Sequence, residues 1–182
     1  MVQENVQISN LTIRPLKIED TIGIRKMQAD AWADVYPNKE AKITRQWVVN
    51  CTAKWFSLVA VKASIEHFKD IINNPDKYYY RVVLDKNKLL GDIFMSKISG
   101  VQCLESLYLD KTLHGKKIAQ KLLDEALEWV DSKKPVVLEV ARYNSRAIAF
   151  YNKYNFEIEK GSEHIFWDKI PVVNMARKGG LE

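Results

Sequence analysis

The chain has 182 residues, of which 47% are hydrophobic and 28% charged; this is the balance of one globular domain and excludes disordered, fibrous and membrane proteins. The apolar stretches are shorter than the roughly 18 residues that span a bilayer, and the first ten residues lack the features of a secretory signal, so we expect a cytoplasmic protein. Neither cysteine has the spacing of metal ligands, so we expect no metal site. The net charge of +5 would suit a polyanionic ligand, but the basic residues are scattered, so we expect no nucleic-acid or membrane partner.

The first part of the chain is predicted to be one strand followed by helical segments. We expect a single domain over residues 1–182, with flexible ends at 1–10 and 178–182, because no linker or repeat divides the sequence. The strand is ended by Pro15, and acidic residues favour the first turn of the helix that follows. The strand and helices are expected at Leu11 to Arg14, Ile18 to Asp34, Ile43 to Cys51 and Ile65 to Ile72.

From Tyr78 the hydrophobic period changes to two, which predicts an antiparallel meander with turns at 85–87 and at Gly100. A helix with one broad apolar face follows from Ile118 and is expected to end at Pro135. The next apolar run predicts a central strand reached by a parallel crossover. The expected strands are Tyr78 to Leu84, Lys88 to Lys97, Val101 to Leu109, Val136 to Val140, Glu163 to Trp167 and Ile170 to Ala176, with a helix from Asn144 to Tyr154. The order is mixed α/β.

The segment from Leu107 to Leu123 places a strand, a short loop and an amphipathic helix in direct succession. Free backbone N–H groups at a helix N-terminus, with the positive end of the helix dipole behind them, can hold a pyrophosphate. Lys116 and Lys117 would add positive charge there. The alternative is an ordinary strand-to-helix connection with a solvated basic turn.

A second informative segment runs from Leu138 to Phe156. It places Asn144 at the end of a strand and Tyr151 seven residues later, on the same face of the following helix. Taken alone, Asn144 would be a helix cap, and Tyr151 with its aromatic neighbour would be core packing.

The two segments, in this order, resemble the signature motifs of the GNAT acetyltransferases, and the resemblance covers Leu11 to Arg177. In that family the loop carries Gln/Arg-x-x-Gly-x-Gly/Ala; here His114, Lys117 and Ala119 stand at the defined positions, and Ala119 matches. The second motif matches at Asn144, Ala147, Phe150, Tyr151 and Phe156, with Asn155 where glycine is usual. Asparagine tolerates the left-handed backbone that such a position requires.

The resemblance implies a mostly antiparallel central sheet of about seven strands, flanked by helices, with a splayed parallel strand pair at the cofactor site. It implies acetyl-coenzyme A (acetyl-CoA) as co-substrate, no metal, and an amine as acceptor. The departures at His114 and Lys117 leave a second interpretation open, a catalytically weakened acyl-CoA-binding regulatory module. The implied cofactor-binding residues are Leu107, Tyr108, Leu109, His114, Gly115, Lys116, Lys117, Ile118, Ala119, Gln120, Asn144, Ala147, Tyr151 and Lys153.

The same resemblance assigns the acid in catalysis to Tyr151, whose phenol would protonate the departing thiolate. A base must take a proton from the amine. Glu105 is the candidate, because it shares strand parity with Leu107 and Leu109, and Glu139 on the neighbouring strand is the alternative.

The acceptor pocket is expected from the first third of the chain and the final hairpin. Trp32 and Tyr36, together with Glu105, are the expected substrate-binding residues, because aromatic rings can hold an amine by cation–π contact. Trp47 and Trp55 could join them, while core packing is expected for at least two of these four aromatic residues. The last hairpin resembles that of bacterial polyamine acetyltransferases, which favours a small amine over a peptide amine; Glu163 or Asp168 could attract such a cation. Association of two copies through the final strands is left open.

Overall fold

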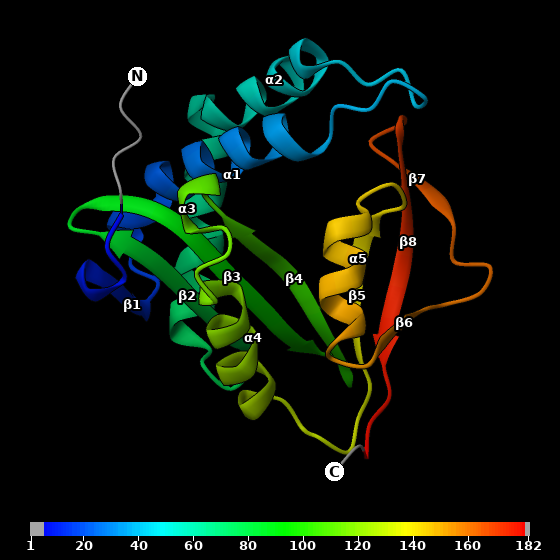
Figure 1. The fold of residues 1–182 in the computed structure, drawn as a ribbon. Helices are drawn as coiled ribbons and strands as arrows, with labels where there is room; N and C mark the ends of the chain where they lie inside the picture. The colour runs from blue at the N-terminus through cyan, green and yellow to red at the C-terminus, as the bar shows by residue number, and fades with distance from the viewer. Residues whose placement is uncertain (1–5, 181–182) are drawn as a thin grey trace.

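The computed structural model describes residues 6–180, which form one eight-stranded sheet with helices on both faces (Figure 1). The strand order is β1-β2-β3-β4-β5-β8-β6, and β7 pairs with β8 beside that path. The β4–β5 pair is parallel and the other pairs are antiparallel. The strands are β1 (Leu11–Pro15), β2 (Tyr78–Asp85), β3 (Lys88–Ile98), β4 (Val101–Leu109), β5 (Val136–Ala141), β6 (Phe156–Ile158), β7 (His164–Phe166) and β8 (Ile170–Arg177).

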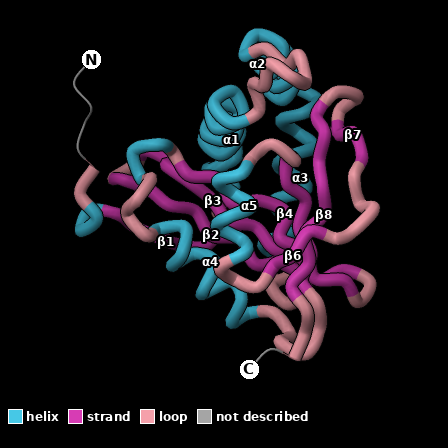
Figure 2. Tube along the Cα trace, turned by 45° about the vertical axis from the view of Figure 1, so that its right-hand side comes forward, coloured by secondary structure: helices cyan, strands magenta, loops and turns pink. Residues whose placement is uncertain are grey.

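Helices cover both faces of this sheet, as Figures 1 and 2 show. On one face, α4 and α5 pack on the largest core cluster, where Leu122 and Leu123 are fully buried. Burying one leucine side chain contributes about 1.5–3 kcal/mol, so these residues hold α4 firmly on the sheet. On the other face, α1 and α3 pack through Ile24 and Phe68. The helices are α1 (Thr21–Val35), α2 (Arg45–Ala53), α3 (Leu58–Asn73), α4 (Ile118–Trp129) and α5 (Ser145–Asn152).

The predicted mixed α/β class, the meander and the parallel crossover are confirmed. Lys86 and Gly100 adopt the left-handed backbone that tight hairpin turns require. One expectation was wrong in detail. The helix predicted from Ile118 ends at Trp129, well before Pro135, because Val130 already has an extended backbone (φ −78°, ψ 162°). The sheet of about seven strands has eight, and the strand that was not predicted is β6, whose three residues are too few to show a period.

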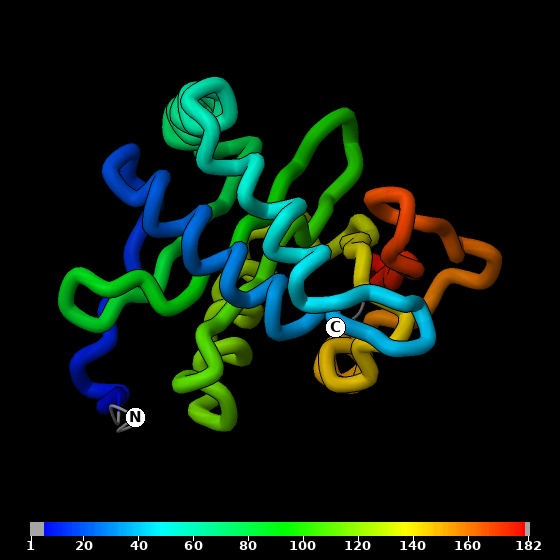
Figure 3. Tube along the Cα trace, turned by 90° about the horizontal axis from the view of Figure 1, so that it is seen from above, coloured from blue at the N-terminus to red at the C-terminus, as the bar shows by residue number. Residues whose placement is uncertain are grey.

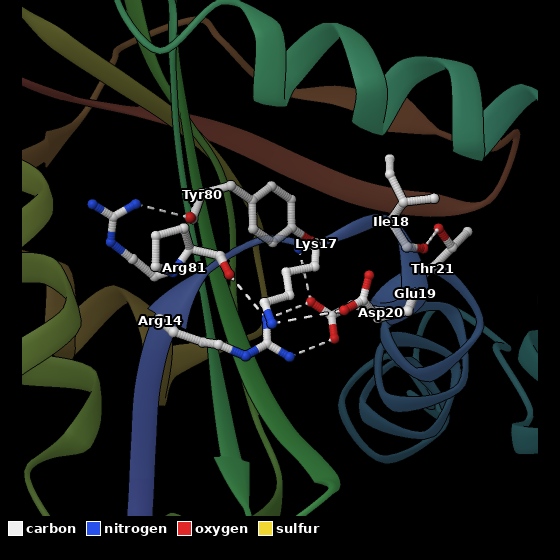
Figure 4. A network of polar contacts seen from close by, with 9 residues as sticks. Arg14, Lys17, Ile18, Glu19, Asp20, Thr21, Tyr80 and Arg81 are labelled. Carbon is white, nitrogen blue, oxygen red and sulfur yellow. Dashed lines mark hydrogen bonds and ion pairs between the residues drawn. The ribbon is translucent and has the colours of Figure 1, made fainter.

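An ion pair fixes β1 to the start of α1 (Figure 4). The Arg14 guanidinium donates to both oxygens of the Asp20 carboxylate, at 2.7 and 2.8 Å, and the Lys17 backbone N–H donates to one of them at 2.9 Å. Burial raises the pKa of Asp20, but these donors together outweigh it and leave the pKa below its ordinary value. The stability that this carboxylate contributes is therefore present above its unfolded pKa and is lost as the pH falls.

Of the expected flexible ends, residues 1–5 and 181–182 lie outside the described residues. Of the remainder, Val6 is buried and Ile8–Asn10 forms a 3-10 turn. At the other end, the Gly180 backbone N–H donates to the Ser132 carbonyl at 2.7 Å. Within residues 6–180, no helix is both long enough and apolar enough to cross a membrane.

Candidate active site

A cavity of about 620 Å³ opens where β4 and β5 separate. The two strands pair only from Gln102–Val136 to Leu104–Leu138, and beyond these pairs they spread apart, as Figure 1 shows. The edge of β4 from Glu105 onward, which faces β5, is therefore free of strand pairing. The cavity is lined by residues of α1, β4, the loop after β4, β5 and α5.

The loop between β4 and α4, here called the cradle loop, has a tightly turned backbone. Asp110 accepts from the Thr112 backbone N–H at 2.8 Å and so starts a short 3-10 turn. Gly115 (φ 77°) and Lys117 (φ 61°) are both left-handed, and α4 begins directly afterwards. Within the part of the chain that the structure describes, the backbone N–H groups of Gly115, Lys117 and Ala119 donate to no protein acceptor. Free backbone N–H groups therefore lie where the sequence predicts a pyrophosphate site.

The side chains of this loop differ from the expectation. The Lys116 ammonium donates to the Val6 carbonyl instead of adding charge to the cradle, and the Lys117 side chain is exposed. His114 Nδ1 lies 2.9 Å from a guanidinium nitrogen of Arg146, a residue that the sequence analysis gave no role. Burial and then the Arg146 charge lower the pKa of His114, so its imidazole is neutral and accepts from Arg146. Positive charge beside this loop comes from Arg146 and from Lys111, which both line the cavity.

The predicted cofactor residues divide into two groups. The cavity is lined by Leu107, Tyr108, Leu109, His114, Ala119, Asn144, Ala147 and Tyr151. The remaining predicted residues, Gly115, Lys116, Lys117, Ile118, Gln120 and Lys153, lie outside this lining. Ile118 is a core residue, and Lys153 is an exposed residue at the end of α5.

Helix α5 presents Tyr151 to the cavity. Asn144 caps the helix by accepting from the Ala147 backbone N–H at 3.1 Å, and the predicted left-handed Asn155 (φ 62°) follows its end. The Tyr151 side chain is 9% exposed and packs edge-on against Phe156. Burial raises the pKa of the Tyr151 phenol, so the hydroxyl keeps its proton at neutral pH and can act as an acid.

The parity argument for Glu105 was wrong, because a β-bulge interrupts the register of β4. Met95 pairs with Leu104 and Phe94 with Ser106, so Glu105 has no residue opposite it. Leu107 packs on the α4 face of the sheet. Glu105 points to the other face, where it accepts from the Ser96 hydroxyl at 2.7 Å. No feature of the local sequence predicts this bulge.

Glu105 nevertheless lines the cavity, and so does the alternative base, Glu139. Glu139 lies on β5 and is paired with His164 of β7, with His164 Nε2 2.7 Å from the carboxylate. Two further carboxylates that the sequence analysis did not select, Asp30 and Asp34, line the same cavity from one face of α1. Their spacing of four residues was the available signal. Lys26 lines the same α1 side, and Asp34 is paired with Arg45, whose Nη1 atom lies 2.5 Å from the carboxylate.

The aromatic residues expected at the acceptor pocket separate in the structure. Tyr36 lines the cavity, and its hydroxyl lies 3.4 Å from that of Tyr108. In Figure 3 the segment after α1 passes beside the segment that leads into α5, and there the Tyr143 hydroxyl donates to the Tyr36 carbonyl at 2.7 Å. Trp32 is a buried core residue, stacked edge-on against Trp55. The remaining predicted residues outside the cavity lining are Trp47, Trp55, Glu163 and Asp168.

Comparisons with solved structures find the same fold. A PaiA N-acetyltransferase from Thermoplasma acidophilum, solved in complex with coenzyme A, has a TM-score of 0.70 and 22% identity, covering 92% of this chain and 98% of its own. A GNAT acetyltransferase from Streptococcus pneumoniae has a TM-score of 0.68 and 17% identity, covering 93% and 99%. The ribosomal-protein-S18-alanine N-acetyltransferase from Escherichia coli has a TM-score of 0.60 and 15% identity, covering 94% and 96%.

No curated protein sequence matches the chain. A family does: residues 27–156, which contain β4, the cradle loop, α4, β5 and α5, match the family described as "Acetyltransferase (GNAT) family". The match extends over most of the chain and includes both segments from which the cavity is built. The chain therefore belongs to the GNAT acetyltransferase family.

Proposed function

We propose that this protein transfers an acetyl group from acetyl-CoA to a primary amine of a small cationic molecule. The observation that carries the proposal is the position of Tyr151. Its phenol keeps its proton and lines one cavity together with the free edge of β4 and several carboxylates. A phenol that can protonate a thiolate and carboxylates that can bind an ammonium group therefore line the same cavity.

Backbone and side-chain groups of this chain suit the chemical groups of coenzyme A. The free N–H groups of the cradle loop and the guanidinium of Arg146 suit a pyrophosphate, and the unpaired edge of β4 offers N–H and C=O groups to the amides of the pantetheine arm. The structural neighbour from Thermoplasma acidophilum is itself a coenzyme A complex, which supports this assignment.

The reaction requires two proton movements that this chain can supply. The amine must lose a proton before it attacks the thioester, and Glu139 or Glu105 can accept that proton directly or through water. The leaving thiolate must gain a proton, and the phenol of Tyr151 can provide it. Acetyl-CoA supplies the activated acyl group when it is bound.

The acceptor class is argued from charge. The cavity is lined by carboxylates and by cationic side chains, and the Tyr36 ring adds an aromatic wall. The carboxylates are Asp30, Asp34, Glu105, Asp110 and Glu139, and the cations are Lys26, Lys88, Lys111 and Arg146. The several carboxylates can hold the ammonium groups of a diamine or polyamine, which supports such an acceptor over a peptide amine with a single charge.

The test is a titration of acetyl-CoA against the wild-type protein and Tyr151→Phe, followed by thiol release with diamines, polyamines, amino acids and peptides. We expect both proteins to bind acetyl-CoA equally and Tyr151→Phe to lose about 100-fold in kcat, the usual size of a general-acid effect. Tyr154→Phe is the matched control, because Tyr154 lies three residues further on and outside the cavity lining, where its hydroxyl contacts the Gln120 carbonyl (3.4 Å) and Asp124.

Two outcomes would overturn the proposal. Binding of acetyl-CoA without turnover of any amine would favour the regulatory module. Absence of binding would mean that the cradle with His114 and Lys117 holds no coenzyme A. Turnover of peptides alone would leave the reaction class standing and replace the small-amine acceptor.

A further inference from the structure

Glu139 is coupled to a histidine for which the sequence analysis gave no role. The His164 Nε2 atom lies 2.7 Å from Glu139 Oε2, although the two residues are on different strands and 25 positions apart. Glu139 lines the cavity, and the side chains of His164 and Glu139 are 46% and 39% exposed. The pair therefore lies at the mouth of the cavity, where it meets solvent.

The orientation of the imidazole is fixed from its other side. His164 Nδ1 lies 3.0 Å from the Ser162 carbonyl, and Ser162 is itself anchored, because its hydroxyl accepts from the Asn174 backbone N–H at 3.0 Å and donates to the Glu159 carbonyl at 2.7 Å. A carbonyl can only accept a hydrogen bond, so Nδ1 carries the proton. In the neutral ring, the lone pair of Nε2 therefore faces Glu139.

The other titratable groups around Glu139 do not compete for a proton at Nε2. On β4, burial and then Glu105 raise the pKa of the Cys103 thiol to about 12, and on the segment after α1 burial raises the pKa of Tyr36. Both groups keep their protons at neutral pH. Glu105 accepts a hydrogen bond from the Ser96 hydroxyl at 2.7 Å. Among the described residues around Glu139, His164 is the base that the carboxyl group directly contacts.

We propose that His164 is a positioning and proton-relay residue for Glu139. The proposal rests on the proposed function. The acceptor ammonium gives one proton to the Glu139 carboxylate, the carboxylic acid passes it to Nε2 of neutral His164, and the imidazolium loses it to water. After attack on the thioester the C–S bond breaks, Tyr151 gives its hydroxyl proton to the thiolate, and the second amine proton restores the Tyr151 hydroxyl. One proton thus reaches solvent and one ends on coenzyme A.

The relay has a definite pH dependence. Protonated His164 donates to Glu139 and makes it a weaker base, whereas the neutral ring can receive the proton. We therefore expect kcat to rise with pH as His164 loses its proton. The Ser162 carbonyl and the Glu139 carboxylate raise the pKa of His164, so this rise should lie above the ordinary pH range of histidine.

The first experiment is the pH profile of kcat for the wild type, His164→Gln and the control His67→Gln, with an amine that the wild type acetylates. Glutamine still donates to Glu139 but cannot take up a proton. We expect His164→Gln to lose about tenfold in kcat and to lose the pH-dependent rise, with an unchanged KM for acetyl-CoA. His67 is an exposed residue outside the cavity, so its variant should behave as the wild type.

Chemical rescue separates a relay from a merely structural role. Added imidazole should restore part of the kcat of His164→Ala, because a free base can fill the gap beside Glu139. A kcat within twofold of the wild type and an unaltered pH profile in His164→Gln would overturn the relay, as would a loss in His164→Ala that imidazole does not change.

A second readout does not depend on turnover. NMR titration of the imidazole ring protons should show that Glu139→Gln lowers the pKa of His164, while His67 and His114 serve as internal references. An unchanged His164 pKa would show that the pair does not form and would overturn the relay. If the wild type acetylates no amine, the proposed function fails and the relay falls with it, whatever the NMR titration shows.

Discussion

At the scale of single residues, Lys117 occupies a position at which its own family uses glycine. Its backbone is left-handed (φ 61°, ψ 11°), a conformation that costs a residue with a Cβ about 1 kcal/mol and costs glycine almost nothing. We therefore expect Lys117→Gly to raise the free energy of unfolding by about 0.5–1 kcal/mol, measured by urea denaturation. Because the lysine side chain is exposed and outside the cavity lining, the affinity for acetyl-CoA should not fall.

Lys121→Gly is the control for this prediction. Lys121 lies inside α4 with ordinary helical neighbours, and glycine there should lower the free energy of unfolding by about 1 kcal/mol. Opposite signs for the two variants would identify the backbone as the cause. A loss of stability or of acetyl-CoA affinity in Lys117→Gly would show instead that the lysine side chain makes a contact of its own.

At the scale of elements, the start of α5 depends on its cap. The Asn144 side chain accepts from the Ala147 backbone N–H, and loss of such a cap costs about 1 kcal/mol. Asn144→Ala should therefore lower the free energy of unfolding by about this amount, whereas Asn144→Ser should restore most of it. If Asn144 acts on acetyl-CoA only by holding α5 in place, the serine variant should also keep the wild-type KM. A serine variant that is stable but binds acetyl-CoA weakly would assign the amide a direct contact.

The elements also show which features of the fold and of the site could be predicted from the sequence. The meander, the cradle loop and the cap at Asn144 depend on local signals, namely period, turn residues and capping chemistry, and these were predictable. The bulge at Glu105 was not, because it depends on the register against β3. The contacts of Arg146 with His114 and of His164 with Glu139 join residues 32 and 25 positions apart, and no local pattern brings such pairs together.

At the scale of the whole molecule, the sheet consists of two parts that are joined by a short stretch of strand pairing. The strands β1 to β4 form one part and β5, β8, β6 and β7 the other, and three residue pairs of β4 and β5 join them. The cavity lies between the separated ends of these two strands and is lined from both parts. A ligand in the cavity would therefore contact both parts at the point where backbone pairing has ended.

This geometry predicts that acetyl-CoA stabilises the whole fold. Binding to the native state adds about 2.7 kcal/mol at a concentration 100 times the Kd, which for a domain of this size corresponds to a rise in Tm on the order of 5–10 °C. Hydrogen exchange should slow most at the unpaired edge of β4, Leu107 to Leu109, and at the end of β5, because these backbone groups otherwise face the open cavity. Adenosine 3′,5′-bisphosphate, which lacks the pantetheine arm, should not slow exchange at the β4 edge. Equal protection of that edge by both ligands would mean that the arm does not pair with β4.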